Sequence, residues 1–146
     1  MAEFLTSVGL DIGTTSTQMI VSRLTVENQA SGFTVPEMVI GNREILYRSP
    51  VHFTPLLDEA RMDAPALGTL IRQEYRAAGL LRENVDTGAV IITGETSRKE
   101  NARAVLAQIT DLAGDFVVAT AGPNLESALA ARGSGAVDFS RETGKT

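Results

Sequence analysis

The sequence contains no cysteine, no tryptophan and a single histidine, His52, among its 146 residues. Without cysteine the chain can form no disulfide, no zinc site with thiolate ligands and no cysteine nucleophile. One histidine is too few for a histidine-based metal site. A Ser–His–Asp triad would have to use His52, but the sequence has no nucleophile elbow to accompany it. We therefore interpret His52 as a structural residue.

Basic clusters and long apolar runs are also scarce. The net charge is −5, and no basic run is longer than the pair Arg98-Lys99. Nucleic acids and anionic lipids are usually bound by clustered basic residues, so the charge pattern disfavours both. No apolar run approaches the ~20 residues that span a bilayer. Met1–Leu5 lacks the basic segment of a secretory signal. We expect a cytoplasmic protein that binds neither nucleic acid nor membrane.

The chain does contain enough apolar residues for one core. Hydrophobic residues make up 43% of the sequence and charged residues 21%, which is typical of a globular protein. A chain of this length buries roughly two-thirds of the surface that its unfolded form exposes. We expect a single domain.

The N-terminal half is rich in strand patterns. Leu5–Asp11 and Gln18–Leu24 are joined by a short link and are therefore predicted to pair as an antiparallel hairpin. Thr25–Pro36 is predicted to be a loop because it combines Asn, Gln, Ser, Gly and Pro. The following segments are predicted as a short strand, a turn and a third strand: Glu37–Ile40, Gly41–Arg43 and Glu44–Ser49.

The C-terminal half alternates helices with strands. Apolar residues at spacings of three and four predict helices over Ala66–Ala78 and from Ser97 to residue 113. Pro65 and Gly79 suit the two ends of the first helix, and Ser97 with Glu100 forms a capping box for the second. The remaining predictions are buried strands at Ala89–Thr93 and Phe116–Ala119, a helix at Leu125–Ala131, and no confident element over Ser134–Thr146.

This order of elements predicts an α/β fold. A hairpin followed by β–α–β crossovers gives a mixed five-stranded sheet with helices on its faces and Leu5–Asp11 at its centre. That is the ribonuclease-H-like arrangement. The fold alone does not determine the function, because one fold serves many functions.

The segment Asp11–Thr17 has the parts of a phosphate-binding turn. The strand before it fixes the position of Asp11, whose carboxylate suits a hydrated divalent cation. Gly13 lets the backbone turn sharply and approach a ligand closely. Thr14–Thr17 offers hydroxyls and backbone N–H groups to phosphate oxygens. The alternative is a β-hairpin turn whose threonines are simply good strand formers.

Other motifs match less well. The glycines Gly9 and Gly13 do not have the spacing of a dinucleotide fingerprint. The end Gly144–Thr146 resembles a Walker loop only superficially, because no strand precedes it. A two-metal nuclease would pair Asp11 with Glu95, but it also needs a further acid and a basic groove. Glu95 is equally suited to the start of a helix, where the dipole favours negative charge.

Longer stretches carry a family resemblance. Asp11–Thr15 resembles the first phosphate loop of the actin/Hsp70/sugar-kinase ATPase superfamily. The region from Val8 to Ala136 is similar, more narrowly, to the ethanolamine ammonia-lyase reactivating factors, the ethanolamine utilization or EutA family. The segments that carry this similarity are Gly9–Gln18, Ile45–Pro50, Phe53–Leu56, Thr87–Ala102, Phe116–Glu126 and Gly133–Ala136. Asp11–Thr15 is specific only to the superfamily, whereas Thr87–Ala102 and Ala119–Pro123 are much more particular to the family.

The resemblance implies an ATP-dependent, chaperone-like factor. Members of the family release damaged cobalamin from inactivated ethanolamine ammonia-lyase, so that intact adenosylcobalamin can bind. The implied cofactors are ATP and Mg²⁺. The matched cofactor-binding residues are Asp11, Gly13, Thr14 and Thr15, with Asp11 also at the metal. No catalytic residue is identified.

The family pattern also includes a second phosphate loop and an adenosine-binding segment, and these 146 residues contain neither. We therefore expect residues 1–136 to be an N-terminal lobe and residues 137–146 a tail toward a second lobe. A homo-oligomer and association with a bacterial microcompartment are left open. So are two alternative functions: a lobe of a small-molecule kinase of the same superfamily, which should lack the Thr87–Ala102 similarity, and a non-enzymatic protein-interaction module.

Overall fold

The computed structural model describes residues 3–28, 38–94, 101–113, 116–121, 123–134 and 136–144. The predicted capping box of Ser97 and Glu100 lies outside these ranges, as does Glu95. The strands are β1 (Glu3–Ile12), β2 (Ser16–Asn28), β3 (Met38–Arg48), β4 (His52–Phe53), β5 (Thr87–Thr93) and β6 (Phe116–Ala121). The helices are α1 (Ala64–Ala77), α2 (Ala102–Ala113), α3 (Pro123–Gly133), α4 (Ala136–Thr143) and a 3₁₀ turn at Arg82–Asn84.

The strands form one mixed sheet with β1 at its centre. Their order is β3-β2-β1-β5-β6, and the two-residue β4 pairs with β2 off this path. β1 pairs antiparallel with β2 and parallel with β5, and β5 pairs parallel with β6. The predicted mixed sheet, its central first strand and the pairing of that strand with the Ala89–Thr93 strand are confirmed. The extra strand β4 was not predicted.

β2 and β3 are longer than the sequence predicted, because bulges replace the expected breaks. β2 continues through Asn28, so the loop predicted to begin at Thr25 is wrong there. The turn predicted at Gly41–Arg43 is also wrong, since β3 passes straight through it. Thr25 is paired with Asn42 and Val26 with Ile40, which leaves Gly41 as an extra residue. Such a bulge accommodates glycine without ending the ladder.

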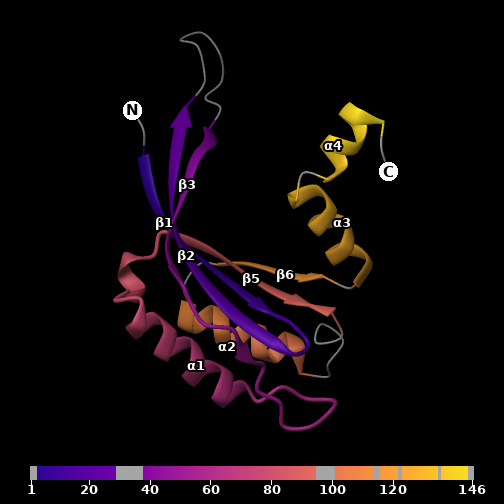
Figure 1. Ribbon diagram of the computed structural model, residues 1–146. Helices are drawn as coiled ribbons and strands as arrows, with labels where there is room; N and C mark the ends of the chain where they lie inside the picture. Colours follow the sequence, from indigo (N-terminus) through magenta and orange to yellow (C-terminus); the bar gives the residue numbers. More distant parts are fainter. Residues whose placement is uncertain are drawn as a thin grey trace.

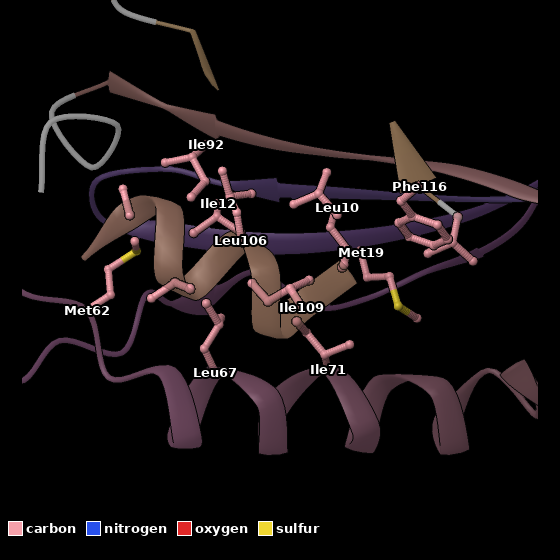
Figure 2. Packing of buried hydrophobic residues seen from close by; sticks show 14 of the residues in the cluster. Leu10, Ile12, Met19, Met62, Leu67, Ile71, Ile92, Leu106, Ile109 and Phe116 are labelled. Atoms are coloured by element: carbon pink, nitrogen blue, oxygen red, sulfur yellow. The ribbon is translucent and has the colours of Figure 1, made fainter. Parts of the chain in front are cut away.

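One face of the sheet carries the core. α1 and α2 lie side by side against this face (Figure 1). Leu67 and Ile71 of α1 point toward the strands, and Ile109 of α2 lies between them and the sheet (Figure 2). The fully or nearly fully buried residues of the sheet and these two helices are Val8, Leu10, Ile12, Met19, Val21, Val90, Ile92, Leu67, Ile71, Ala102, Val105, Leu106 and Ile109. The predicted apolar stripes of both helices are therefore confirmed.

The opposite face is not covered in the same way. Phe116–Ala119 was predicted to be buried, but Val117 is 69% exposed. Val118 pairs with the core residue Val90 and so lies on the other face, yet it is 41% exposed on β6, the last strand in the sheet order. Val117 is paired with Ala89, so both lie on the face directed away from α1 and α2. α3 and α4 stand beyond the end of β6 rather than across this face (Figure 1). The prediction failed because an apolar run shows that a strand can be buried, not that both of its faces are.

α1 has the caps that its sequence suggests and one that was missed. It begins at Ala64, and the Asp63 carboxylate accepts a hydrogen bond of 2.9 Å from the Ala66 N–H. Pro65 lies in the first turn, and Gly79 follows the helix with a φ of +64°. This left-handed conformation favours glycine after a helix.

No helix in the described ranges is long and apolar enough to span a membrane.

The chain beyond α3 differs from its prediction. Ser134–Thr146 was expected to hold no confident element, yet residues Ala136–Thr143 form α4. The boundary predicted between a lobe at 1–136 and a tail at 137–146 therefore coincides with the start of α4. The division into a lobe and a tail stays a prediction.

A polar network ties α1 to β3 and β4. Glu74 of α1 is buried, and its carboxylate accepts a hydrogen bond of 2.7 Å from the Tyr47 hydroxyl. His52 Nε2 lies 2.7 Å from the second Glu74 oxygen. The hydrogen bond to Glu74 raises the pKa of Tyr47 above its usual range. His52 thus holds β4 against α1, in agreement with its interpretation as a structural residue.

Tyr75, next to Glu74 on the same helix, has the opposite environment. Its hydroxyl is buried and has no hydrogen-bond partner within the described structure. Burial raises the pKa of Tyr75 to about 12. The two tyrosines therefore form a matched pair, one with a satisfied hydroxyl and one without.

We predict that Tyr47→Phe lowers the free energy of unfolding at pH 7 by about 1–3 kcal/mol, because it removes a hydrogen bond to a buried carboxylate. Tyr75→Phe should change it by less than about 0.5 kcal/mol or raise it, because no hydrogen bond is lost. Urea denaturation of both variants measures the difference. Equal losses would contradict the assignment of the two hydroxyls.

The raised pKa of Tyr75 gives a second prediction, for the stability of the protein at alkaline pH. An unfolded tyrosine ionises near pH 10, whereas burial keeps folded Tyr75 neutral up to about pH 12. Between these values the folded state binds more protons than the unfolded state, so the stability falls as the pH rises. Tyr75→Phe should make this decrease shallower.

Candidate functional site

The candidate site is the turn between β1 and β2. β1 ends at Ile12 and β2 begins at Ser16, so Gly13, Thr14 and Thr15 form the connection. The Gly13 N–H donates a hydrogen bond of 2.8 Å to the Ser16 carbonyl. A Cβ atom at Gly13 would lie 3.0 Å from that same carbonyl oxygen. The tightness of the turn therefore accounts for glycine at this position.

Asp11 lies at the carboxyl end of the central strand. Its neighbours Leu10 and Ile12 point into the core, so Asp11 points to the opposite face, where it is exposed. Because β1 and β5 are parallel, their carboxyl ends meet at one edge of the sheet. The Thr93 hydroxyl at the end of β5 donates a hydrogen bond of 3.2 Å to Asp11 Oδ1. This bond orients a carboxylate directly beside the turn.

The predicted row of hydroxyls is shorter than expected. Thr14, Thr15 and Ser16 are exposed, as a ligand would require. Thr17 is only 3% exposed, and its hydroxyl lies 3.0 Å from that of Thr54. The phosphate-binding role predicted for the Thr17 hydroxyl is therefore wrong. Side chains alternate between the faces of a strand, and position 17 of β2 points into the protein.

Thr54, which follows β4, was not identified as a site residue from the sequence. Its hydroxyl donates a hydrogen bond of 2.8 Å to the Gly13 carbonyl. Its N–H donates one of 2.9 Å to the Thr15 carbonyl. The only available signal was that Thr54 lies within the family-like segment Phe53–Leu56. Nothing in the sequence indicates a contact with a turn 41 residues away.

Asp11 and the exposed hydroxyls of the turn could hold a hydrated Mg²⁺ ion together with phosphate groups. Among the described residues, no three His, Cys, Asp or Glu side chains gather at one point. Mg²⁺ commonly keeps several waters and takes one or two carboxylates plus substrate phosphates. Asp11 beside a tight turn with exposed hydroxyls is a donor set of that kind. Glu95, the second acid of the nuclease alternative, lies outside the described residues.

Comparison with known proteins decides the family. The family model for the ethanolamine utilisation protein EutA matches residues 3–146. The chain belongs to the EutA family. The match includes Thr87–Ala102, the segment that a small-molecule kinase should not share.

Two curated relatives carry the name ethanolamine ammonia-lyase reactivase EutA. The protein of Escherichia coli (strain K12) is 48% identical over 138 residues. The protein of Salmonella typhimurium (strain LT2) is 46% identical over the same length. Each alignment covers 94% of this chain and 30% of the relative. The chain therefore spans less than a third of the length of these proteins.

Solved structures support the fold. A crystal structure of the Aquifex aeolicus member of the Ppx/GppA family matches with a TM-score of 0.52 and 16% identity, covering 83% of this chain and 36% of that one. A second structure of an Aquifex aeolicus PPX-GPPA enzyme gives a TM-score of 0.52 at 14% identity, covering 81% and 36%. The chain therefore has the predicted ribonuclease-H-like α/β fold of actin-like ATPase lobes, and at this identity the likeness concerns the fold alone.

We predict that Gly13→Ala lowers the free energy of unfolding by about 1–2 kcal/mol, because the added Cβ crowds a backbone oxygen that the turn cannot easily move. Gly9→Ala, in the strand that leads to the turn, is the matched control, since a Cβ there would lie 3.9 Å from the Ile20 carbonyl oxygen, an ordinary van der Waals contact. It should change the stability by less than about 0.5 kcal/mol. Thermal denaturation of both variants checks this, and equal effects would contradict the tight turn.

Proposed function

We propose that this chain is the N-terminal, nucleotide-binding lobe of an ATP-dependent, chaperone-like factor. In this proposal the factor reactivates ethanolamine ammonia-lyase by releasing damaged cobalamin. The observation that carries the proposal is the turn at Gly13 beside Asp11, at the end of the central strand of an actin-like lobe in a member of the EutA family. The reactivase names of the two relatives support the partner.

In this proposal Asp11 and the residues of the turn bind different parts of Mg·ATP. Gly13 lets phosphate approach the backbone, which a side chain at that position would prevent. The exposed hydroxyls of Thr14, Thr15 and Ser16 supply hydrogen bonds to phosphate oxygens. Asp11 holds the Mg²⁺ shell, directly or through water. When bound, Mg²⁺ neutralises charge on the phosphates.

The proposed setting follows from the same family. The cofactors are ATP and Mg²⁺, the partner is ethanolamine ammonia-lyase, and the place of work is the cytoplasm, with or without a bacterial microcompartment. The base of the nucleotide would bind outside these 146 residues, because they contain no adenosine-binding segment. A non-enzymatic interaction module is the competing function, and the experiments below separate the two.

In the full-length protein, Asp11→Asn should reduce ATP-dependent reactivation of cobalamin-inactivated lyase by at least about tenfold, because a neutral amide is a weaker ligand for Mg²⁺ than a carboxylate. Gly13→Val should act likewise by blocking phosphate. The melting temperature of Asp11→Asn should stay close to that of the wild type, since the side chain is exposed.

Asp86→Asn is the matched control for this change. Asp86 lies near the opposite end of β1, where its carboxylate accepts a hydrogen bond of 2.7 Å from the Thr6 N–H. An asparagine oxygen can accept the same bond, so activity should be retained. A stable Asp11→Asn protein with full reactivation would refute the assignment of Asp11 to the site. Reactivation or lyase binding that needs no nucleotide would favour the interaction module.

The 146-residue chain alone should bind Mg·ATP at least about a hundredfold more weakly than the full-length protein and should not hydrolyse it. Each ~1.4 kcal/mol of lost contact weakens binding about tenfold, and the second phosphate loop and the adenosine pocket are both missing. Titration calorimetry and phosphate release measure the two properties. Micromolar binding, or steady hydrolysis by the purified chain, would show that one lobe suffices.

A further inference from the structure

The carbonyl groups of the β1–β2 turn are held on one side by a single residue. Thr54 binds the Gly13 carbonyl through its hydroxyl at 2.8 Å and the Thr15 carbonyl through its N–H at 2.9 Å. The carbonyl of Ser16, at the start of β2, accepts the Gly13 N–H across the turn. The carbonyls of Gly13, Thr15 and Ser16, which would repel a phosphate, are therefore engaged within the protein.

The direction of these carbonyls sets the direction of the turn's N–H groups. The described chain has no cis peptide bond, and a trans peptide points its carbonyl and its N–H in opposite directions. The Gly13 carbonyl points toward Thr54, so the Thr14 N–H points away from it. The Ser16 N–H points away in the same manner, because the Thr15 carbonyl also faces Thr54. We call the side toward which the Thr14 and Ser16 N–H groups point, away from Thr54, the donor side of the turn.

The hydroxyl of Thr54 also accepts a hydrogen bond from a neighbour. A hydroxyl has one proton and two lone pairs, and Thr54 gives its proton to the Gly13 carbonyl. The 3.0 Å contact between the Thr54 and Thr17 hydroxyls must then use the Thr17 proton. The bonds run in one direction, from Thr17 to Thr54 to Gly13. Both threonines are buried, at 3% and 7% exposure, where such bonds are stronger than in water.

The segment that carries Thr54 is anchored on both sides to α1. On one side, His52 lies 2.7 Å from the buried carboxylate of Glu74. On the other side, the Pro55 carbonyl accepts a hydrogen bond of 3.0 Å from the N–H of Asp63, the N-cap residue of the helix. His52 and Phe53 of β4 also pair with Thr17 and Ser16 of β2. The segment that carries Thr54 is therefore tied to both α1 and β2.

We propose that Thr54 is a positioning residue for nucleotide binding: it holds the carbonyls of Gly13 and Thr15 so that the donor side of the turn faces the phosphates of Mg·ATP. This rests on the proposed function, since it assigns a further residue to the same site. Thr54 itself does not contact the ligand. The competing explanation is that Thr54 only stabilises the fold.

The test compares four versions of the full-length protein. Thr54→Val keeps the shape of the side chain but loses the hydroxyl, and Thr54→Ser restores the hydroxyl. Thr17→Val removes the other hydroxyl of the same buried pair, which costs similar stability, yet leaves the bond from Thr54 to Gly13 in place. If Thr54→Val does not fold, the smaller Thr54→Ala serves the same purpose. Each protein is measured for melting temperature, Mg·ATP affinity by calorimetry and amide hydrogen exchange over residues 13–16 without nucleotide.

Thr54→Val should weaken Mg·ATP binding about tenfold, the equivalent of one buried hydrogen bond of ~1.4 kcal/mol. Its turn amides should exchange faster than those of the wild type. Thr54→Ser should stay within about twofold of the wild-type affinity, because the donor is present again. Thr17→Val should show a melting temperature similar to that of Thr54→Val but retain most of the affinity.

The outcomes separate the two proposals. Wild-type affinity and exchange in Thr54→Val would overturn the role of Thr54 and leave the proposed function standing. Equal losses of affinity in Thr17→Val and Thr54→Val would also overturn it, because affinity would then follow stability alone. Absence of Mg·ATP binding by the wild-type protein would refute the proposed function itself.

Discussion

The parallel pairing of β1 with β5 is the interaction on which the rest of this structure depends. It places two strand ends at one edge of the sheet, which brings the Thr93 hydroxyl to the carboxylate of Asp11. It also aligns the alternate residues Leu10 and Val90, whose face is closed by α1 and α2. Core and candidate site thus come from the same register. A slip by one residue would exchange their faces, putting Asp11 in the core.

Short-range sequence patterns correctly predicted the parts of the structure that are formed by residues close together in the chain. The spacing of apolar residues predicted the stripes of α1 and α2, and the short link predicted the β1–β2 hairpin. Asp11 and Gly13 were found because strand, carboxylate and glycine are adjacent in the sequence. Gly41 was misread, because glycine marks both turns and bulges, and only pairing with β2 distinguishes them. Val117 was misread since its neighbours cannot show which face of a strand is covered.

Some features of the turn could be predicted from the sequence and others could not. Its exposed hydroxyls lie within a few residues of Gly13 and were recognised together. Thr17 belongs to the same run of hydroxyls, but strand alternation directs it into the protein, toward Thr54. Thr54 reaches the turn only because β3 and then β4 run back along β2, so its two hydrogen bonds have no local signature. Residues that are adjacent in the sequence are thus easier to group into a candidate site than a residue that the fold brings to them.

The bulges of β3 have a consequence for self-association. β3 is the last strand of the sheet on its side, and Met38, Ile40, Ile45 and Leu46 along it are all more than 40% exposed. A straight, apolar edge of this kind invites another strand to add to it and so promotes aggregation. The two register shifts, opposite Val21/Ser22 and Thr25/Val26, interrupt the regular spacing of backbone donors and acceptors. A second chain therefore meets three short stretches of edge instead of one long one, and the sheet is protected against open-ended growth.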